Sequence, residues 1–260
     1  MDTFLQEHKC IVICGCESIY ERRDRLNYYK KRGIEAIYRK NNRILYDYHI
    51  HCNTINIGIV LQGKLIWENE GDIITLSPEE VFCVMPFCLH RLSSDSISSL
   101  LMMSISLDDF IQKGDNVLLY DIKDFLLYYN IFCNRTILLN IAKVLSDIYI
   151  NSDYLREIEK KNAYIKLLDE TETLDEMAGL MNYSKYHFLR KFKNVIRITP
   201  HKLKQIRMVR KAQEMFNTGE IPGEVIKYLN YYDQSHFIKQ FKHIVGVTPT
   251  EYMDAVKRSK

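Results

Sequence analysis

The stretch that decides the fold is residues 237–249, FIKQFKHIVGVTP, because a second version stands earlier in the chain, at residues 188–200, FLRKFKNVIRITP. Phe, Phe-Lys and Thr-Pro occupy matching places, 49 residues apart. The two Phe of each stretch lie at i and i+4, so they share one face of a helix. The repetition predicts two copies of one helical unit in the C-terminal half.

A short helix and a tight turn are predicted ahead of each copy. Thr173 and Glu176 have the spacing of a capping box at the start of the first short helix. Asn182 and Asn230 mark the two turns, because asparagine tolerates a left-handed backbone better than most residues. Two short helices joined by a tight turn, the second apolar inside and polar outside, form a helix-turn-helix.

The outward side chains of the second helix of each unit are predicted to contact DNA. They are hydrogen-bonding side chains of the kind that contact base edges and phosphates in a major groove. In the first unit they are Lys185, Tyr186, His187, Arg190 and Lys191, and in the second they are Gln234, Ser235, His236, Lys239 and Gln240.

A helix over about residues 199–217 is predicted to join the two units. Its apolar stripe is Leu203, Ile206, Val209, Ala212 and Phe216. At 1.5 Å per residue it spans about 27 Å. With its end turns, it can hold the two units about one DNA repeat apart, roughly 34 Å. The chain would then enter two successive major grooves.

Charge is divided unevenly along the chain, which has a net charge of +3. Residues 177–260 hold 16 Lys and Arg against 6 Asp and Glu, whereas residues 1–152 hold 16 against 19. A basic C-terminal half suits a polyanion. A plain helical repeat with Phe in its core is the alternative, but it would not require the polar outer faces, the turns and the single connecting helix together.

Residues 154–253 resemble the DNA-binding domain of AraC/XylS-type transcription regulators. The stretches that carry the resemblance are LDEMAGLMNYSKYHFLRKFK, TPHKLKQIRMVRKAQEMF and YYDQSHFIKQFKHIVGVTPTEY. The resemblance implies base- or phosphate-facing positions for Tyr186, Leu189 and Arg190 in the first unit. It implies the same for Gln234, Ser235, His236 and Lys239 in the second.

This chain departs from that family at several positions. Asn182 and Asn230 stand where the turns usually carry Gly, and Arg197 replaces another usual Gly that the second unit keeps as Gly246. Ile226 stands where the family has a small Ala. The larger side chain predicts a repacked second unit with a shifted recognition helix.

The first hundred residues have the pattern of strands. The stretch INIGIVLQGKLIWENEGDIITLSPEEVFCVMP has short apolar runs with turn signals between them, and hairpin turns are expected at residues 62–64 and 70–72. Short strands at this spacing suggest a barrel or jelly roll. The family resemblance implies a cupin-like barrel that binds a small effector, followed by helices that dimerise.

Three histidines are candidates for contact with that effector: His49, His51 and His90. Two histidines at i and i+2 in a strand point to one side, as a metal site would also require. The carboxylate expected a few residues after His51 in metal-dependent cupins is absent. The sequence therefore favours polar lining of an organic effector pocket and predicts neither a metal nor a cofactor. The alternative that the barrel only dimerises or binds another protein stays open.

Several other classes of protein find little support in the sequence. The seven cysteines are odd in number and lie between residues 10 and 133 of a long chain, unlike a secreted disulfide scaffold. His8, Cys10, Cys14 and Cys16 could bind a soft metal, although small apolar positions in an early strand explain the cysteines as well. No apolar run suits a membrane span, and no phosphate loop or catalytic motif is present.

These observations predict an α+β fold of two domains. A cupin-like β-rich regulatory domain is expected in residues 1–115 and a helical dimerisation or linker region in residues 116–152. An all-α DNA-binding domain, with two helix-turn-helix units on a long linker helix, is expected in residues 153–260.

The expected function is that of a cytoplasmic, homodimeric transcription regulator, an activator rather than an enzyme. Its expected partners are double-stranded promoter DNA, RNA polymerase and a small effector, and no membrane. One alternative is a cupin-type small-molecule or metal-binding enzyme with a structural helical tail. Another is a nucleoid-type binder without sequence preference.

Overall fold

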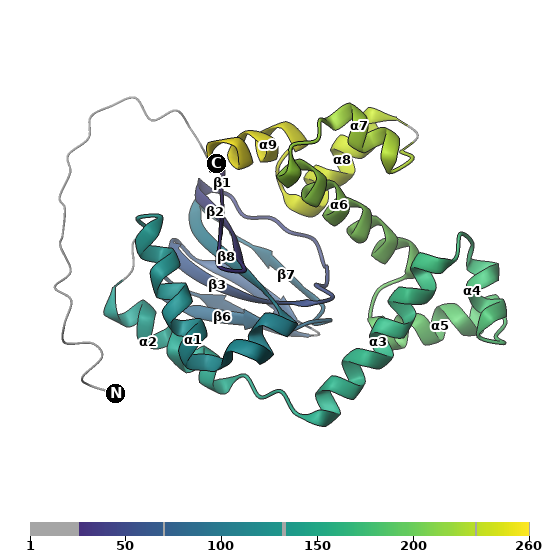
Figure 1. Ribbon diagram of the computed structural model, residues 1–260, viewed down its shortest axis with the longest axis horizontal. Helices are drawn as coiled ribbons and strands as arrows, with labels where there is room; N and C mark the ends of the chain where they lie inside the picture. Colours follow the sequence, from purple (N-terminus) through teal and green to yellow (C-terminus); the bar gives the residue numbers. More distant parts are fainter. Residues whose placement is uncertain (1–25, 70, 132–133, 232, 260) are drawn as a thin grey trace.

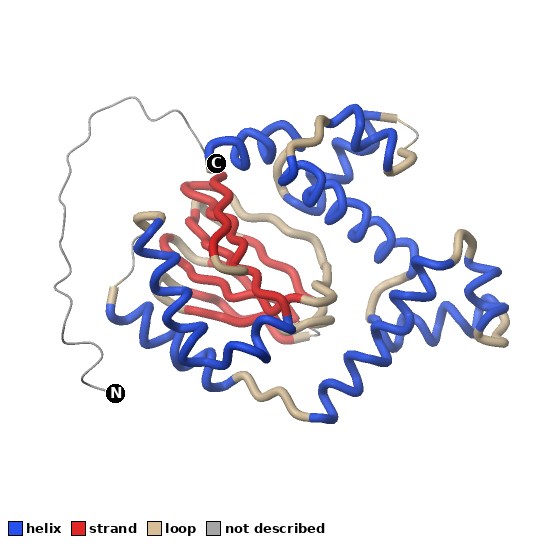
Figure 2. Tube along the Cα trace, in the orientation of Figure 1, coloured by secondary structure: helices blue, strands red, loops and turns tan. Residues whose placement is uncertain are grey.

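A computed structural model describes residues 26–69, 71–131, 134–231 and 233–259 (Figure 1). The group formed by His8, Cys10, Cys14 and Cys16 lies outside the described residues. Within them, no helix combines the length and the apolar character that crossing a bilayer would require. Figure 2 shows the strands gathered in one body and the helices arranged around and beside it.

In the described part of the chain, the strands form two sheets. The larger has the order β1-β2-β8-β3-β6 and the smaller the order β5-β4-β7. Their bounds are β1 (Leu26–Lys31), β2 (Ile34–Asn42), β3 (Thr54–Gln62), β4 (Leu65–Asn69), β5 (Asp72–Leu76), β6 (Val81–Val84), β7 (His90–Ser93) and β8 (Ser98–Ser106). Side chains between the sheets, such as Val60, Leu65 and Leu100, are buried together. This is the predicted cupin-like barrel.

The turn at Gly71 joins a hairpin as predicted, because β4 and β5 pair antiparallel on either side of it. The hairpin predicted at residues 62–64 is wrong, since β3 and β4 belong to different sheets. Gly63 has a φ of 75° there, and a Cβ would lie 2.7 Å from the carbonyl oxygen of Ile97. The left-handed glycine carries the chain from one sheet to the other.

Two helices follow the barrel in the described chain, α1 (Leu107–Tyr128) and α2 (Arg135–Asp147). Helix α1 begins where the Ser106 side chain accepts a hydrogen bond from the Asp109 amide, and it is kinked at Gly114, whose φ is 68°. The helical segment therefore begins before residue 116, where the change of pattern had indicated it.

The C-terminal helices are α3 (Ser152–Glu170), α4 (Leu174–Leu180), α5 (Lys185–Ile196), α6 (Pro200–Thr218), α7 (Pro222–Tyr228), α8 (Gln234–Val245) and α9 (Pro249–Arg258). The predicted capping box of Thr173 and Glu176 is present at the start of α4. Thr199 caps α6, which ends at the left-handed Gly219. Helices α4 and α5 form the first helix-turn-helix unit, and α7 and α8 form the second.

Both units contain the same turn. Asn182 and Asn230 are left-handed, with φ of 53° and 52°. The Tyr183 amide donates to the carbonyl of Ala178 at 2.9 Å, and the Tyr231 amide donates to that of Ile226 at 3.1 Å. Ile226 is therefore accommodated without loss of the turn. The segment after the turn is one residue longer in the second unit, between Leu229 and Gln234, than in the first, between Met181 and Lys185.

Candidate DNA-binding surface and interdomain cavity

Helix α5 presents the predicted contact residues of the first unit to solvent. Lys185, Tyr186, His187, Arg190 and Lys191 are all exposed, and Tyr186 is 87% exposed. The opposite face is held by Phe188 and Phe192, which are completely buried. The His187 ring lies on Tyr183 of the turn, with centroids 4.4 Å apart. Lys185 forms an ion pair of 2.9 Å with Asp175 on α4.

Helix α8 presents the second set in the same way, with one exception. Gln234, Ser235, His236 and Lys239 are exposed, whereas Gln240 is half-buried. The Nε2 atom of Gln240 is buried and has no hydrogen-bond partner in the described structure. Phe237 and Phe241 are completely buried beneath this surface. Of the five residues predicted in this helix, Gln240 is therefore the one turned partly inward.

The two recognition helices lie at opposite ends of α6 (Figure 1). Helix α5 ends just before Pro200, where α6 begins. Near the other end of α6, the ring of Phe216 packs against Phe237 and Phe241, with centroids 6.4 and 5.7 Å away. The first unit instead packs on α3, where Tyr164 meets Phe192 edge to face at 5.5 Å. Each unit thus has its own aromatic core.

The second unit is also fastened to the barrel. Its core includes Leu26 and Tyr28 from β1, and the Tyr28 and Tyr252 rings meet at 6.0 Å. Arg39 of β2 is only 2% exposed and donates to the carbonyl of Val245 at the C-terminus of α8, at 2.8 Å. A cation at that end of a helix is favoured by the helix dipole. These contacts join β1 and β2 to the second recognition unit.

Asp47 makes a further link between the barrel and the C-terminal helices. Its carboxylate accepts from Lys202 of α6 at 2.8 Å and lies 3.1 Å from Nε2 of His243 on α8. Burial alone would raise the pKa of Asp47, but hydrogen bonds from Lys202 and from the Tyr48 backbone, with a weaker one from His243, lower that pKa to about 2. The carboxylate is therefore charged at neutral pH and holds two helices at once.

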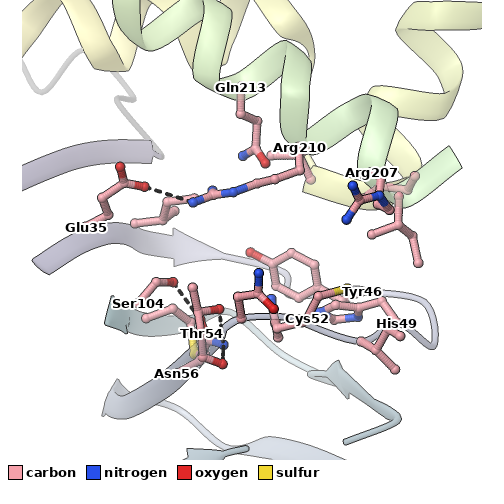
Figure 3. A pocket seen from close by; sticks show the side chains of 18 of the residues that line it. Glu35, Tyr46, His49, Cys52, Thr54, Asn56, Ser104, Arg207, Arg210 and Gln213 are labelled. Carbon is pink, nitrogen blue, oxygen red and sulfur yellow. Dashed lines mark hydrogen bonds and ion pairs between the residues drawn. The ribbon is translucent and has the colours of Figure 1, made fainter. Parts of the chain in front are cut away.

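A cavity of ≈ 370 Å³ lies between the barrel and α6 (Figure 3). This volume falls in the range of small-molecule sites, about 300–1,000 Å³. The barrel lines it with apolar and neutral polar side chains, among them Tyr46, Cys52 and Asn56, and with the acid Glu35. Helix α6 adds Ile206, Arg207, Arg210 and Gln213. The cavity is thus formed by both halves of the chain, and no local pattern in α6 predicts that it forms one wall.

The two arginines of the cavity are both paired with acids. Arg210 reaches from α6 to Glu35 of β2 at 3.0 Å, as Figure 3 shows. Arg207 contacts Asp169 of α3 at 2.6 Å. Burial raises the pKa of Glu35, but Lys30 and Arg210 outweigh burial and lower it overall. The spacing of i and i+3 predicts that Arg207 and Arg210 share a face of α6, but not that this face meets the barrel.

The three predicted histidines do come together at the barrel wall of this cavity. One ring nitrogen from each of His49, His51 and His90 lies within 4.8 Å of the others. The ring centroids of His49 and His90 are 4.3 Å apart. Burial lowers the pKa of all three, that of His90 to about 3. The imidazoles are therefore neutral at pH 7, and they can accept hydrogen bonds or bind a metal ion.

A helix-turn-helix domain model matches residues 177–255. Among solved structures, ToxT from Vibrio cholerae O395 aligns with 87% of this chain and 99% of that chain, at a TM-score of 0.59 and 13% identity. The unsaturated fatty acid bound wild-type ToxT from Vibrio cholerae strain SCE256 aligns with 85% of this chain and 94% of that chain, at a TM-score of 0.52 and 16% identity. At these identities the likeness is one of fold. No curated protein sequence matches significantly.

Proposed function

We propose that this chain is an AraC/XylS-type DNA-binding transcription regulator, because a helix-turn-helix domain model matches residues 177–255. We propose that it binds specific promoter sequences through two successive major grooves. The observation that carries the proposal is the pair of exposed polar helix faces, each backed by two buried Phe, at opposite ends of α6. In the proposal, residues 153–260 bind DNA and residues 1–115 sense an effector.

Subunit contact is proposed for the region 116–152 with the neighbouring part of α1. Large apolar side chains are exposed there: Ile111, Val117, Tyr120, Leu127, Tyr128 and Leu139. A homodimer would cover them and would double the number of DNA contacts. The proposal also includes activation in the cytoplasm through contact with RNA polymerase, as the family resemblance implies.

The rigid connection between the two units leads to a footprint prediction. Helix α6 has 19 residues, about 28 Å at 1.5 Å per residue. We expect hydroxyl-radical footprinting of a bound promoter to show two protected patches about 10 base pairs apart on one face of the duplex. Inserting half a helical turn, about 5 base pairs, between the patches rotates one groove away and should abolish the second patch. A single patch, or protection that tolerates the insertion, contradicts the two-groove proposal.

A small anionic effector with an apolar body is proposed for the cavity between the barrel and α6. The cavity offers Arg207 and Arg210 beside apolar side chains such as Ile37, Ile50 and Ile206. The similar ToxT structure that is described as bound to an unsaturated fatty acid supports this chemistry. A carboxylate in the cavity would compete with Glu35 for Arg210. Because that ion pair joins β2 to α6, such competition would change how the barrel holds the DNA-binding half.

The competition predicts opposite effects for the two members of this ion pair. Glu35→Gln removes the competing charge, so we expect a monounsaturated fatty acid to bind about tenfold more tightly. Arg210→Gln removes a charge-assisted hydrogen bond worth about 1.5–3 kcal/mol, so we expect binding at least about tenfold weaker. Isothermal titration calorimetry measures both, and the matching fatty alcohol is the uncharged control ligand. Equal changes for acid and alcohol would contradict a role for charge.

A further inference from the structure

His49 and His90 are held face to face by the backbone. They form an antiparallel bridge in which the His49 amide donates to the His90 carbonyl at 3.0 Å and the His90 amide donates to the His49 carbonyl at 3.1 Å. Residues paired in this way project their side chains to the same side. His51 lies outside the named strands, and its ring centroid is 5.0 Å from that of His49 and 5.3 Å from that of His90. The fold itself directs the three imidazoles toward one point.

Some ring nitrogen atoms of these histidines have hydrogen-bond partners and others do not. Nδ1 of His49 lies 2.8 Å from the Asp47 carbonyl, and Nδ1 of His90 lies 3.0 Å from the Cys88 carbonyl. A carbonyl can only accept, so both Nδ1 atoms carry the proton and both Nε2 atoms present a lone pair. Nε2 of His90 is buried and has no partner in the described structure. Orienting a ring through its other nitrogen is what supporting groups do for a metal-binding histidine.

The spacing is also close to what one metal ion requires. The candidate ligand atoms lie within 4.8 Å of one another. A tetrahedral zinc ion with bonds of about 2.0–2.1 Å needs nitrogen atoms about 3.3 Å apart. Rotation of the side chains can make up the difference.

The ligand chemistry selects the class of metal. Three imidazoles suit zinc, iron, cobalt, nickel or copper, whereas magnesium and calcium prefer oxygen ligands. Three neutral ligands leave the full +2 charge on the ion. An anion is therefore favoured as the next ligand, and the histidines line the same cavity as Arg207 and Arg210.

We propose that His49, His51 and His90 bind one divalent transition metal ion, zinc being the first candidate, whose remaining coordination position opens to the interdomain cavity and takes the anionic group of the effector. The metal site stands on the three histidines alone, whereas its contact with the effector rests on the proposed function. Zinc binding would also supply the partner that the buried Nε2 of His90 lacks.

The first experiment measures zinc uptake by the intact chain. The protein is stripped with a chelator, checked for folding by circular dichroism, and titrated with zinc chloride by calorimetry, with magnesium chloride as the control. We expect one zinc per chain, and an affinity at least about 100-fold lower in His51→Ala and in His90→Ala. His201→Ala, at an exposed histidine near the start of α6, is the matched control and should bind as the wild type does.

One further variant and one result on the wild-type chain can each contradict the proposal. Cys10→Ser/Cys14→Ser/Cys16→Ser removes the other group of soft ligands and should leave zinc uptake unchanged. If uptake falls in this variant and not in His51→Ala, the ion binds elsewhere and the proposal is wrong. If a folded wild-type chain takes up neither zinc nor cobalt, it is also wrong, whether or not the histidine variants fold.

The effector contact is tested on the cobalt-loaded chain. Its visible spectrum should change when a monounsaturated fatty acid is added and should not change with the matching alcohol. If the acid binds without altering the spectrum, the effector does not coordinate the metal. Promoter binding is measured separately, so loss of the metal proposal and loss of the DNA-binding proposal can be told apart.

Discussion

Arg190→Ala/Lys239→Ala loses specific promoter binding while the chain stays folded. Both side chains are exposed on the recognition helices, Arg190 on α5 and Lys239 on α8. Removing one such contact costs about 1–3 kcal/mol if it touches a base. The two lie at opposite ends of α6 and share no partner in the described structure, so their effects should add to about 2–6 kcal/mol. A competition assay between promoter and random duplex at fixed salt measures the loss.

The control for this variant removes the same charges elsewhere. Arg43→Ala/Lys64→Ala takes one Arg and one Lys from exposed positions on the barrel, just after β2 and just before β4. It should leave promoter binding within about twofold of the wild type, because screening weakens the effect of charges far from the duplex. If the α5/α8 variant and this barrel variant bind equally well, the assignment of DNA contacts is wrong. If only non-specific binding changes, the residues touch phosphates rather than bases.

Phe241→Ala should lower the free energy of unfolding by about 3–5 kcal/mol, since it leaves a cavity in a core that cannot close fully. Phe241 is completely buried, and its ring packs against Phe216 of α6 and Tyr252 of α9, each with a centroid separation of 5.7 Å. Because this core includes Leu26 and Tyr28 of β1, the damage should extend into the barrel. Urea unfolding measures the first effect, and hydrogen exchange of the β1 amides measures the second.

Phe192→Ala is the matched variant in the first unit. Phe192 is equally buried, but its neighbour is Tyr164 of α3, and β1 contributes only the partly buried Tyr29 to its core. It should cost a similar free energy of unfolding and raise exchange in β1 less than Phe241→Ala does. Tyr186→Ala, at an exposed position, should cost little stability. If Phe192→Ala and Phe241→Ala raise exchange in β1 equally, the second unit is not coupled to the barrel as described.

The helix-turn-helix units could be predicted because their signals are local. The repeated Phe pairs, the Thr173 cap and the left-handed Asn182 and Asn230 act within a few residues of the sequence, and all appear in the structure as expected. The structural role of Gly63 could not be predicted from the sequence, because a left-handed glycine suits a hairpin turn and a crossing between two sheets equally well. Only the pairing of β4 with β5 and β7 separates the two.

The sequence by itself determined the two recognition units and the helix that joins them, because these follow from the period of the helix. Only the tertiary structure decided that His49, His51 and His90 lie together and that Arg210 meets Glu35, 175 residues away in the chain. Such contacts depend on which face of α6 packs toward the barrel. That choice is made by the combined burial of Leu26, Tyr28 and the core of the second unit, which no short stretch of sequence contains.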